Sequence, residues 1–436
     1  MFNNLPALVV ALLAGSAAAI DLKINDEQSI KNAAATAAFN TMSKYTSNST
    51  GHIPGKLDGT WWLGAALFRT MIEYWYFTGD ASNNKARGEN NYFPSNYSQY
   101  LSNDDQMAWG LAAMTAAELG YVEDSSKPSW LTLAEGVFRS QVARWDTESC
   151  DGGLRWQIWP YQDGYNKKDA VSNGGLFQLS ARLARYTKNT TYSDWAEKIW
   201  DWSAGVPILN TAEWTINDVV DVDSDCKTHQ DIQWTHNYGE YISGAAYMYN
   251  LTNGETSKWK AGLDGLLNTS FHKFFPESYG GNIMVEISCE PLNTCSRDHE
   301  VYKGLFASDL AAVARMAPHT KSEILKRLQG SAVGAAKQCS GGENGAICGE
   351  QWYKSKWDGV TGMETQMSAT SLFTSNLVAF EHMNLATHNT STSTTQNTSS
   401  TPTKTQSEAT SSIQNGGNSL RSQFGPGVLL VSALFL

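Results

Sequence analysis

The chain has few positive charges for its length. Its 436 residues include 32 Lys and Arg against 43 Asp and Glu, a net charge of −11. An acidic chain offers no basic surface to a phosphate backbone, so we expect no nucleic acid partner.

Residue spacings that bind metals are also missing. No cysteines are spaced as Cys-x-x-Cys and no histidines as His-x-x-x-His, which argues against zinc. Asp104 and the acid after it resemble the DDxxD helix of metal-dependent prenyl enzymes, but Ala108 stands where the third acid belongs. The acidic run 221–225 resembles a calcium loop, yet Cys226 replaces the turn glycine and Ile232 the bidentate glutamate. We therefore predict no metal and no cofactor.

The apolar run at the start of the chain is too short to span a bilayer comfortably. Residues 1–19 predict a signal peptide, although no Lys or Arg precedes the apolar core. Residues 385–415 are rich in Ser and Thr and predict a disordered, O-glycosylated stalk. Residues 416–436 resemble a glycosylphosphatidylinositol attachment propeptide, with attachment at Asn415. We expect a secreted protein, lipid-anchored at the outer face of the plasma membrane or in the cell wall, whose folded domain covers 20–384.

The cysteines and the sequons suit that location. Six cysteines in a secreted chain imply disulfides and allow fifteen pairings. The short separations favour Cys289–Cys295 and Cys339–Cys348 as local bridges, which leaves Cys150–Cys226 as a longer one. Candidate N-glycosylation sites are Asn48, Asn96, Asn189, Asn250, Asn268, Asn389 and Asn397.

A repeat of about sixty-five residues runs through the chain. Glycines at 110, 175, 239 and 304, separated by 65, 64 and 65 residues, each stand near the start of an apolar helical stretch. Further apolar stretches cover 62–76 and 367–380. More amphipathic stretches are predicted at 27–45, 130–145, 192–203, 256–267 and 321–337. Because helices that are apolar nearly all round are buried ones, inner and outer helices alternate.

Six such pairs predict an all-α fold, an (α/α)6 toroid with an inner barrel inside an outer ring. The second outer helix has the weakest pattern, because Gly79, Gly88 and Pro94 interrupt it. Strands are not required, although residues 280–288 are suited to a short hairpin. The inner helices run the same way, so their N-termini share one rim.

The residues at this rim are mostly carboxylates, amides and aromatics, a composition typical of a carbohydrate cleft. Loops before the helices add Trp156, Trp159, Tyr161 and Tyr165. The residues that we expect to contact a substrate there are Trp61, Trp109, Asn173, Asn237, Tyr238 and Gln366.

Asp104 and Asp105 are the candidate catalytic pair at this rim. One short polar side chain suffices to cap a helix, and Ser102 or Asn103 can supply it, so two adjacent acids are more than capping needs. Cleavage of a glycosidic bond uses one carboxylic acid and one carboxylate, about 5–5.5 Å apart in a retaining mechanism. The helix dipole favours ionisation of one acid, and repulsion raises the pKa of the other. The alternative is that one aspartate merely caps the helix.

Four motifs resemble glycoside hydrolase family 76, and in particular its fungal branch of anchored cell-wall proteins. They are Asn103-Asp104-Asp105-Gln106-x-x-Trp109-Gly110-Leu111, Ser172-Asn173-Gly174, Gln233-Trp234-x-x-Asn237-x-Gly239 and Glu364-x-Gln366-Met367-Ser368-Ala369. The resemblance covers about residues 21–380. It departs from the family pattern at Trp62, where an acid is expected, and over 80–100, which is shorter and less helical.

The resemblance implies an (α/α)6 barrel and retaining endo-cleavage of α-1,6-linked mannose. By likeness, Asp104 is the nucleophile and Asp105 the general acid/base. The implied substrate is α-1,6-mannan or the mannose core of lipid-anchored glycoproteins, with wall β-glucan as a possible acceptor. A carbohydrate-binding wall protein without turnover is the alternative.

Overall fold

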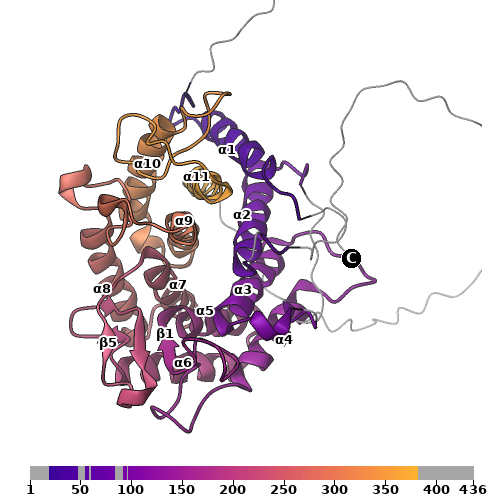
Figure 1. Ribbon diagram of the computed structural model, residues 1–436, viewed down its shortest axis with the longest axis vertical. Helices are drawn as coiled ribbons and strands as arrows, with labels where there is room; N and C mark the ends of the chain where they lie inside the picture. Colours follow the sequence, from indigo (N-terminus) through magenta and orange to yellow (C-terminus); the bar gives the residue numbers. More distant parts are fainter. Residues whose placement is uncertain (1–18, 48–54, 58–59, 84–91, 96, 382–436) are drawn as a thin grey trace, which may run out of the picture.

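The computed structural model describes residues 19–47, 55–57, 60–83, 92–95 and 97–381 (Figure 1). The predicted stalk, the attachment signal and nearly all of the signal peptide fall outside these residues, as do Asn48, Asn96, Asn389, Asn397 and Asn415. None of the described helices is both long enough and apolar enough to cross a bilayer.

Six helices form a closed inner ring. In ring order they are α2 (Trp62–Thr78), α3 (Asn103–Leu119), α5 (Ala170–Thr187), α7 (Thr235–Leu251), α9 (His299–Met316) and α11 (Met363–Asn376). Each packs against the next, and α11 packs against α2 to close the ring. Figure 1 shows them around a common centre. The predicted inner barrel is confirmed.

Outer helices wrap this ring. They are α1 (Glu27–Met42), α4 (Trp130–Val142), α6 (Thr190–Gly205), α8 (Ser257–Phe274) and α10 (Lys321–Gln338). Between α2 and α3 the described residues contain only the short 3-10 helix η2 (Ser98–Tyr100), so the second outer helix has no counterpart among them. This is where the sequence pattern is weakest.

Short strands occur where none was required. The strands β1 (Lys167–Asp169), β4 (Val219–Asp221) and β5 (His229–Gln230) form one antiparallel sheet, and β2 (Leu209–Asn210) pairs with β3 (Thr215–Ile216).

The hairpin expected over 280–288 is wrong. The backbone N–H of Val285 donates to the Phe274 carbonyl (2.9 Å) and that of Met284 to Ser331 Oγ (2.9 Å). These two donors are therefore used on α8 and α10 rather than on a partner strand, and residues 280–288 contain no strand.

The repeated glycines allow the inner helices to approach closely. A Cβ at Gly304 would lie 2.5 Å from the Cα of Ser368 on α11, and one at Gly175 would lie 2.5 Å from Met107 Cγ on α3. Only hydrogen fits at such distances. The 65-residue glycine spacing thus records close contacts of the inner helices, with one another at these two positions and with the outer helix α4 at Gly110.

The ring interior is filled by buried ion pairs on the side away from the helix N-termini. Arg69 lies 2.6 Å from Asp309, and Arg182 lies 2.8 Å from Glu118. Removing one partner of such a pair leaves a buried charge uncompensated, which is strongly destabilising. These pairs close the barrel below the rim where α3 begins.

Three disulfides join Cys150 to Cys226, Cys289 to Cys295 and Cys339 to Cys348, in the pairing that the sequence favoured. The first ties the loop after α4 to the segment after β4. The other two close loops that precede the inner helices α9 and α11.

The described sequons differ in their surroundings. Asn189 and Asn268 are exposed. Asn250 is half-buried, and its Nδ2 donates to the Met316 carbonyl (3.0 Å). A glycan at Asn250 would have to break that hydrogen bond, so the structure favours the other two sites.

Replacing Gly304 with alanine tests the glycine contacts. We expect Gly304→Ala to lower the free energy of unfolding by about 1–3 kcal/mol, because the new methyl group meets backbone that cannot rotate away. Gly205→Ala is the matched control: its Cβ would meet nothing within 4 Å at the end of α6, so stability should hold or rise slightly. Denaturant unfolding followed by circular dichroism measures both, and equal stability of the two variants would contradict this account.

Candidate active site

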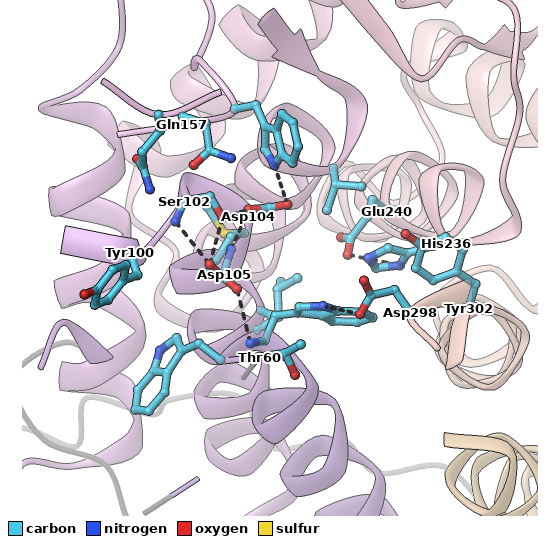
Figure 2. A pocket seen from close by; sticks show the side chains of 18 of the residues that line it. Thr60, Tyr100, Ser102, Asp104, Asp105, Gln157, His236, Glu240, Asp298 and Tyr302 are labelled. Carbon is cyan, nitrogen blue, oxygen red and sulfur yellow. Dashed lines mark hydrogen bonds and ion pairs between the residues drawn. The ribbon is translucent and has the colours of Figure 1, made fainter. Parts of the chain in front are cut away.

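A cavity of about 360 Å³ opens at the rim where the inner helices begin. Figure 2 shows side chains from α2, α3, α7 and α9 facing it, together with a loop near Gln157. The lining residues are Thr60, Trp61, Trp62, Tyr97, Tyr100, Ser102, Asp104, Asp105, Met107, Ala108, Leu111, Trp156, Gln157, Gln162, Val171, His236, Glu240, Asp298 and Tyr302.

Helix α3 presents its acids to this cavity. Asp104, Asp105 and Ala108 are its only residues that are not buried, and all three line the cavity. The remaining residues of α3 pack inside the protein, so the helix is fixed in place and only its first two turns are open.

Ser102 caps α3, and Asp105 completes the cap. The Asp105 carboxyl accepts from the Ser102 backbone N–H (3.1 Å), as in a capping box, and contacts the Ser102 hydroxyl (2.9 Å). The Trp62 backbone N–H at the start of α2 also donates to it (3.2 Å). Asp105 therefore takes part in the cap, and it also lines the cavity, so capping alone does not account for its position.

Asp104 is held by a different set of donors. Its carboxylate accepts from the Trp156 indole N–H (3.0 Å) and from the backbone N–H of Asp105 (2.8 Å), and it contacts the Ser102 hydroxyl. The backbone N–H of Asn103 donates to the Trp156 carbonyl (2.9 Å), which fixes the loop that carries the indole.

The Ser102 hydroxyl lies between the two carboxyl groups (Figure 2). Because both contact one oxygen, their nearest oxygens are within about 6 Å of each other. A hydroxyl has one hydrogen, so it donates to one carboxylate only. Its second contact is favourable when the other carboxyl carries a proton and donates to Oγ. The arrangement therefore suits a pair that holds one proton.

Burial raises the pKa of both acids toward that state. Burial raises the pKa of Asp105 to about 7, and the charge of Asp104 adds to the effect. Burial also raises the pKa of Asp104, while its hydrogen bonds from Ser102, Asp105 and Trp156 act in the opposite direction. The two acids lie in one site, but different hydrogen bonds favour the ionised form of each.

Other titratable groups around the pair favour their neutral forms near pH 7. Burial, with the Asp104 charge as second cause, raises the pKa of Asp169 to about 8. Burial lowers the pKa of His236 to about 4 and raises the pKa of Tyr97 and Tyr302.

The opposite wall combines ring faces with polar atoms. The Trp62 indole donates to Asp298 Oδ1 (3.1 Å) and stacks on the His236 ring, with centroids 6.1 Å apart and planes 18° apart. Glu240 lies on the floor with its Oε2 buried and unpartnered, and Tyr302 packs on His236. Where the family pattern led us to expect an acid, Trp62 thus bonds Asp298, which directly precedes α9 and lines the cavity. Such a set of ring faces and polar atoms fits a sugar.

One of the six residues expected to contact a substrate, Trp61, lines the cavity, and five do not. The Asn173 amide bonds the backbone N–H (2.8 Å) and carbonyl (3.0 Å) of Leu154. The Gln366 amide does the same for Cys348, at 3.0 and 2.9 Å. These amides hold the loops that approach the rim.

The other three also support the site from behind. The Asn237 amide donates to Asp218 (2.9 Å) and the Tyr238 hydroxyl to Gln233 (2.7 Å). The Trp109 indole donates to the Trp61 carbonyl (3.0 Å). The expectation was wrong because each of these side chains points from its helix toward neighbouring elements, whereas the cavity is lined by other faces of the same helices.

Sequence reasoning also missed several lining residues. Glu240 lies one turn after His236, so helical spacing alone would have found it. Thr60, Tyr97, Tyr100, Gln157 and Gln162 belong to loops or a 3-10 turn, where no periodic signal exists.

The described residues contain one group with metal-ligand geometry, Cys289, Cys295 and Glu350. Its two sulfurs are joined in a disulfide and are not available as thiolate ligands.

Removing the Ser102 hydroxyl tests the shared proton. The hydroxyl lowers the pKa of Asp104, so Ser102→Ala should raise that pKa and narrow the pH range of kcat/KM from the acidic side. In the wild-type profile the basic limb should lie near pH 7, where Asp105 loses its proton. The acidic limb should lie at the pH at which Asp104 gains a proton. Ser102→Thr retains a hydroxyl and should restore the width. A profile of unchanged width and lower height in Ser102→Ala would show that the residue only caps the helix.

Comparison with known proteins gives a consistent result. A family model described as "Glycosyl hydrolase family 76" matches residues 29–389. Mannan endo-1,6-alpha-mannosidase of Saccharomyces cerevisiae is 39% identical over 364 residues, covering 80% of each chain. A putative mannan endo-1,6-alpha-mannosidase of Schizosaccharomyces pombe is 38% identical over 381 residues, covering 85% of this chain and 84% of the relative.

Solved structures agree. The crystal structure of Dfg5 from Chaetomium thermophilum in complex with glucosamine has a TM-score of 0.79 and 37% identity, covering 84% of this chain and 94% of that one. An alpha-1,6-mannanase of Salegentibacter sp. was solved as an inactive variant in complex with alpha-1,6-mannotriose. Its TM-score is 0.62 at 18% identity, and the match covers 80% of this chain and 99% of that one, which shows the same fold. The chain belongs to glycoside hydrolase family 76.

Proposed function

We propose that this protein is a retaining, endo-acting α-1,6-mannosidase or transglycosidase. One observation carries the proposal: two carboxyl groups share one hydroxyl at the edge of a cavity lined by rings and polar atoms, in a site that favours a single proton between them. A retaining glycosidase needs such a pair at short separation.

The roles follow from the hydrogen bonds. Asp104, with its indole and amide donors, attacks the anomeric carbon as a carboxylate. The bond between that carbon and the glycosidic oxygen breaks, and the oxygen leaves with the proton of Asp105. Asp105, now a carboxylate, takes a proton from water or from an acceptor hydroxyl. The oxygen so activated attacks the same carbon and releases Asp104.

The substrate assignment draws on the relatives. Those reported above carry the name mannan endo-1,6-alpha-mannosidase or putative mannan endo-1,6-alpha-mannosidase and are 38–39% identical to this chain. The substrate proposed here is α-1,6-mannan or the mannose core of lipid-anchored glycoproteins. Transfer to a wall β-glucan is the corresponding transglycosylation. The signal peptide and the lipid anchor at the cell surface or wall remain predictions from the sequence.

Asparagine variants separate an enzyme from a binding protein. We expect Asp104→Asn and Asp105→Asn each to lower kcat on α-1,6-mannotetraose by about 10²–10⁴-fold, because each removes a proton-transfer or nucleophilic group. Affinity for the same sugar should change little. Product analysis with and without an oligoglucan shows whether water or glucan accepts the mannosyl group.

Asp26→Asn is the control for these variants. Asp26 caps α1 through the backbone N–H of Ser29 (3.0 Å), and asparagine caps helices equally well, so activity should be unchanged. Full activity in both active-site variants, with intact folding, would show that a different pair catalyses the reaction, whereas a wild-type protein that binds the sugar without cleaving it would leave the carbohydrate-binding alternative.

A further inference from the structure

We propose that aromatic rings at the mouth of the cavity and beyond it form a second glycan-binding surface. It consists of Tyr100, Trp159 and Tyr161, and we call it the aromatic shelf. Its ligand is the remote part of the mannan chain whose cleaved bond lies at Asp104 and Asp105. The inference rests on the proposed function and extends it to sugars beyond the cavity.

The exposure of Tyr100 and Tyr161 is unusual for this protein. Among the described residues, three aromatic side chains are largely exposed: Phe39 at 71%, Tyr100 at 59% and Tyr161 at 69%. Tyr100 lines the cavity, and Tyr161 contacts the same short segment of chain as Tyr100. Two of the three exposed aromatic rings therefore gather at the mouth of the site, although exposed rings are costly in water.

The shelf is held rigidly by its polar edges. The Trp159 indole donates to the Ser98 carbonyl (2.9 Å), and the Tyr161 hydroxyl donates to the Gln99 carbonyl (3.2 Å). These bonds join the loop that carries both rings to η2. The ring planes of Trp159 and Tyr161 are within 7° of parallel, with centroids 6.3 Å apart.

The loop beneath the shelf is also fixed. Gly164 has φ +91°, and a Cβ there would lie 2.4 Å from the Trp156 ring, so the loop turns directly over the indole that binds Asp104. Rings fixed in this way lose little conformational freedom when a ligand binds, which favours affinity.

The shelf continues the lining of the cavity. Trp61, Tyr97 and Tyr100 all line it, and their rings follow one another at centroid distances of 6.1 and 5.3 Å. Gln162, another lining residue, accepts from the backbone N–H of Trp159 (3.1 Å). A glycan that leaves the cavity past Tyr100 therefore meets Trp159 and Tyr161 next.

A sugar chain fits this surface better than a protein does. Amphipathic rings with fixed polar edges offer their faces to the apolar side of a pyranose. A stable protein interface buries about 800 Å² on each partner, far more than three rings provide. The cavity itself lies at the lower end of the range for ligand sites, about 300–1,000 Å³, so a long chain must extend beyond it.

The test compares α-1,6-mannotriose with α-1,6-mannohexaose. Binding is measured by calorimetry on full-length protein with Asp104→Asn and Asp105→Asn, so that the ligand is not consumed. An additional Asn96→Gln change removes the neighbouring sequon, so that no attached glycan occupies the shelf. We expect the hexaose to bind about two- to tenfold more tightly than the triose. Tyr161→Ala should abolish this advantage and leave triose affinity unchanged.

Two controls complete the design. Tyr161→Phe keeps the ring and should keep the advantage of the hexaose, whereas Phe39→Ala removes an equally exposed ring on α1 and should change neither affinity. Equal affinities for the two sugars, or a loss in Tyr161→Ala that is the same for both, would overturn the shelf. If the length effect is present but the wild-type protein never cleaves mannan, the shelf stands and the proposed enzymatic function fails.

Discussion

The hydrogen bonds around Ser102 are the interaction on which the site depends. This residue ends the loop before α3, caps the helix through Asp105 and contacts Asp104 with the same hydroxyl. One turn of backbone thus fixes the position of both acids. The helix N-terminus favours negative charge, while burial and mutual repulsion oppose it. These opposing effects leave the pKa of Asp105 at about 7, close to the pH at which a general acid works.

That balance has a cost in stability. A carboxyl whose pKa is about 7 in the folded protein and about 4 in the unfolded chain holds a proton that unfolding releases above pH 4. Folding stability contributed by Asp105 therefore falls as pH rises from about 4 to about 7. Close packing of the closed inner ring opposes such a cost.

Much of the fold could be predicted from the sequence because the pattern is long and regular. The glycines at 110, 175, 239 and 304 marked the inner helices, and the paired aspartates marked the rim. The same reasoning misplaced Asn173, Asn237, Tyr238, Gln366 and Trp109 in the cavity, because a polar residue near a helix start looks alike whether it binds a ligand or a loop.

No pattern in the sequence indicated the loop residues that line the cavity. Tyr100, Gln157 and Gln162 come to the site through the bonds that join η2, the loop after α4 and the start of α3. Those contacts are non-local, so composition and periodicity say nothing of them. The amides that were expected to bind sugar proved instead to be part of what brings such loops to the rim.

The central claim is that Asp104 and Asp105 hold one proton between them near neutral pH. Titration of the folded protein with ¹³C-labelled aspartate, followed by NMR of the carboxyl carbons, measures this directly, with Asp104→Asn and Asp105→Asn used to assign the signals. We predict that one of the two carboxyls stays protonated up to about pH 7 and that its pKa falls when the other is replaced by asparagine. Two carboxyls that are both ionised by pH 5 would contradict the account.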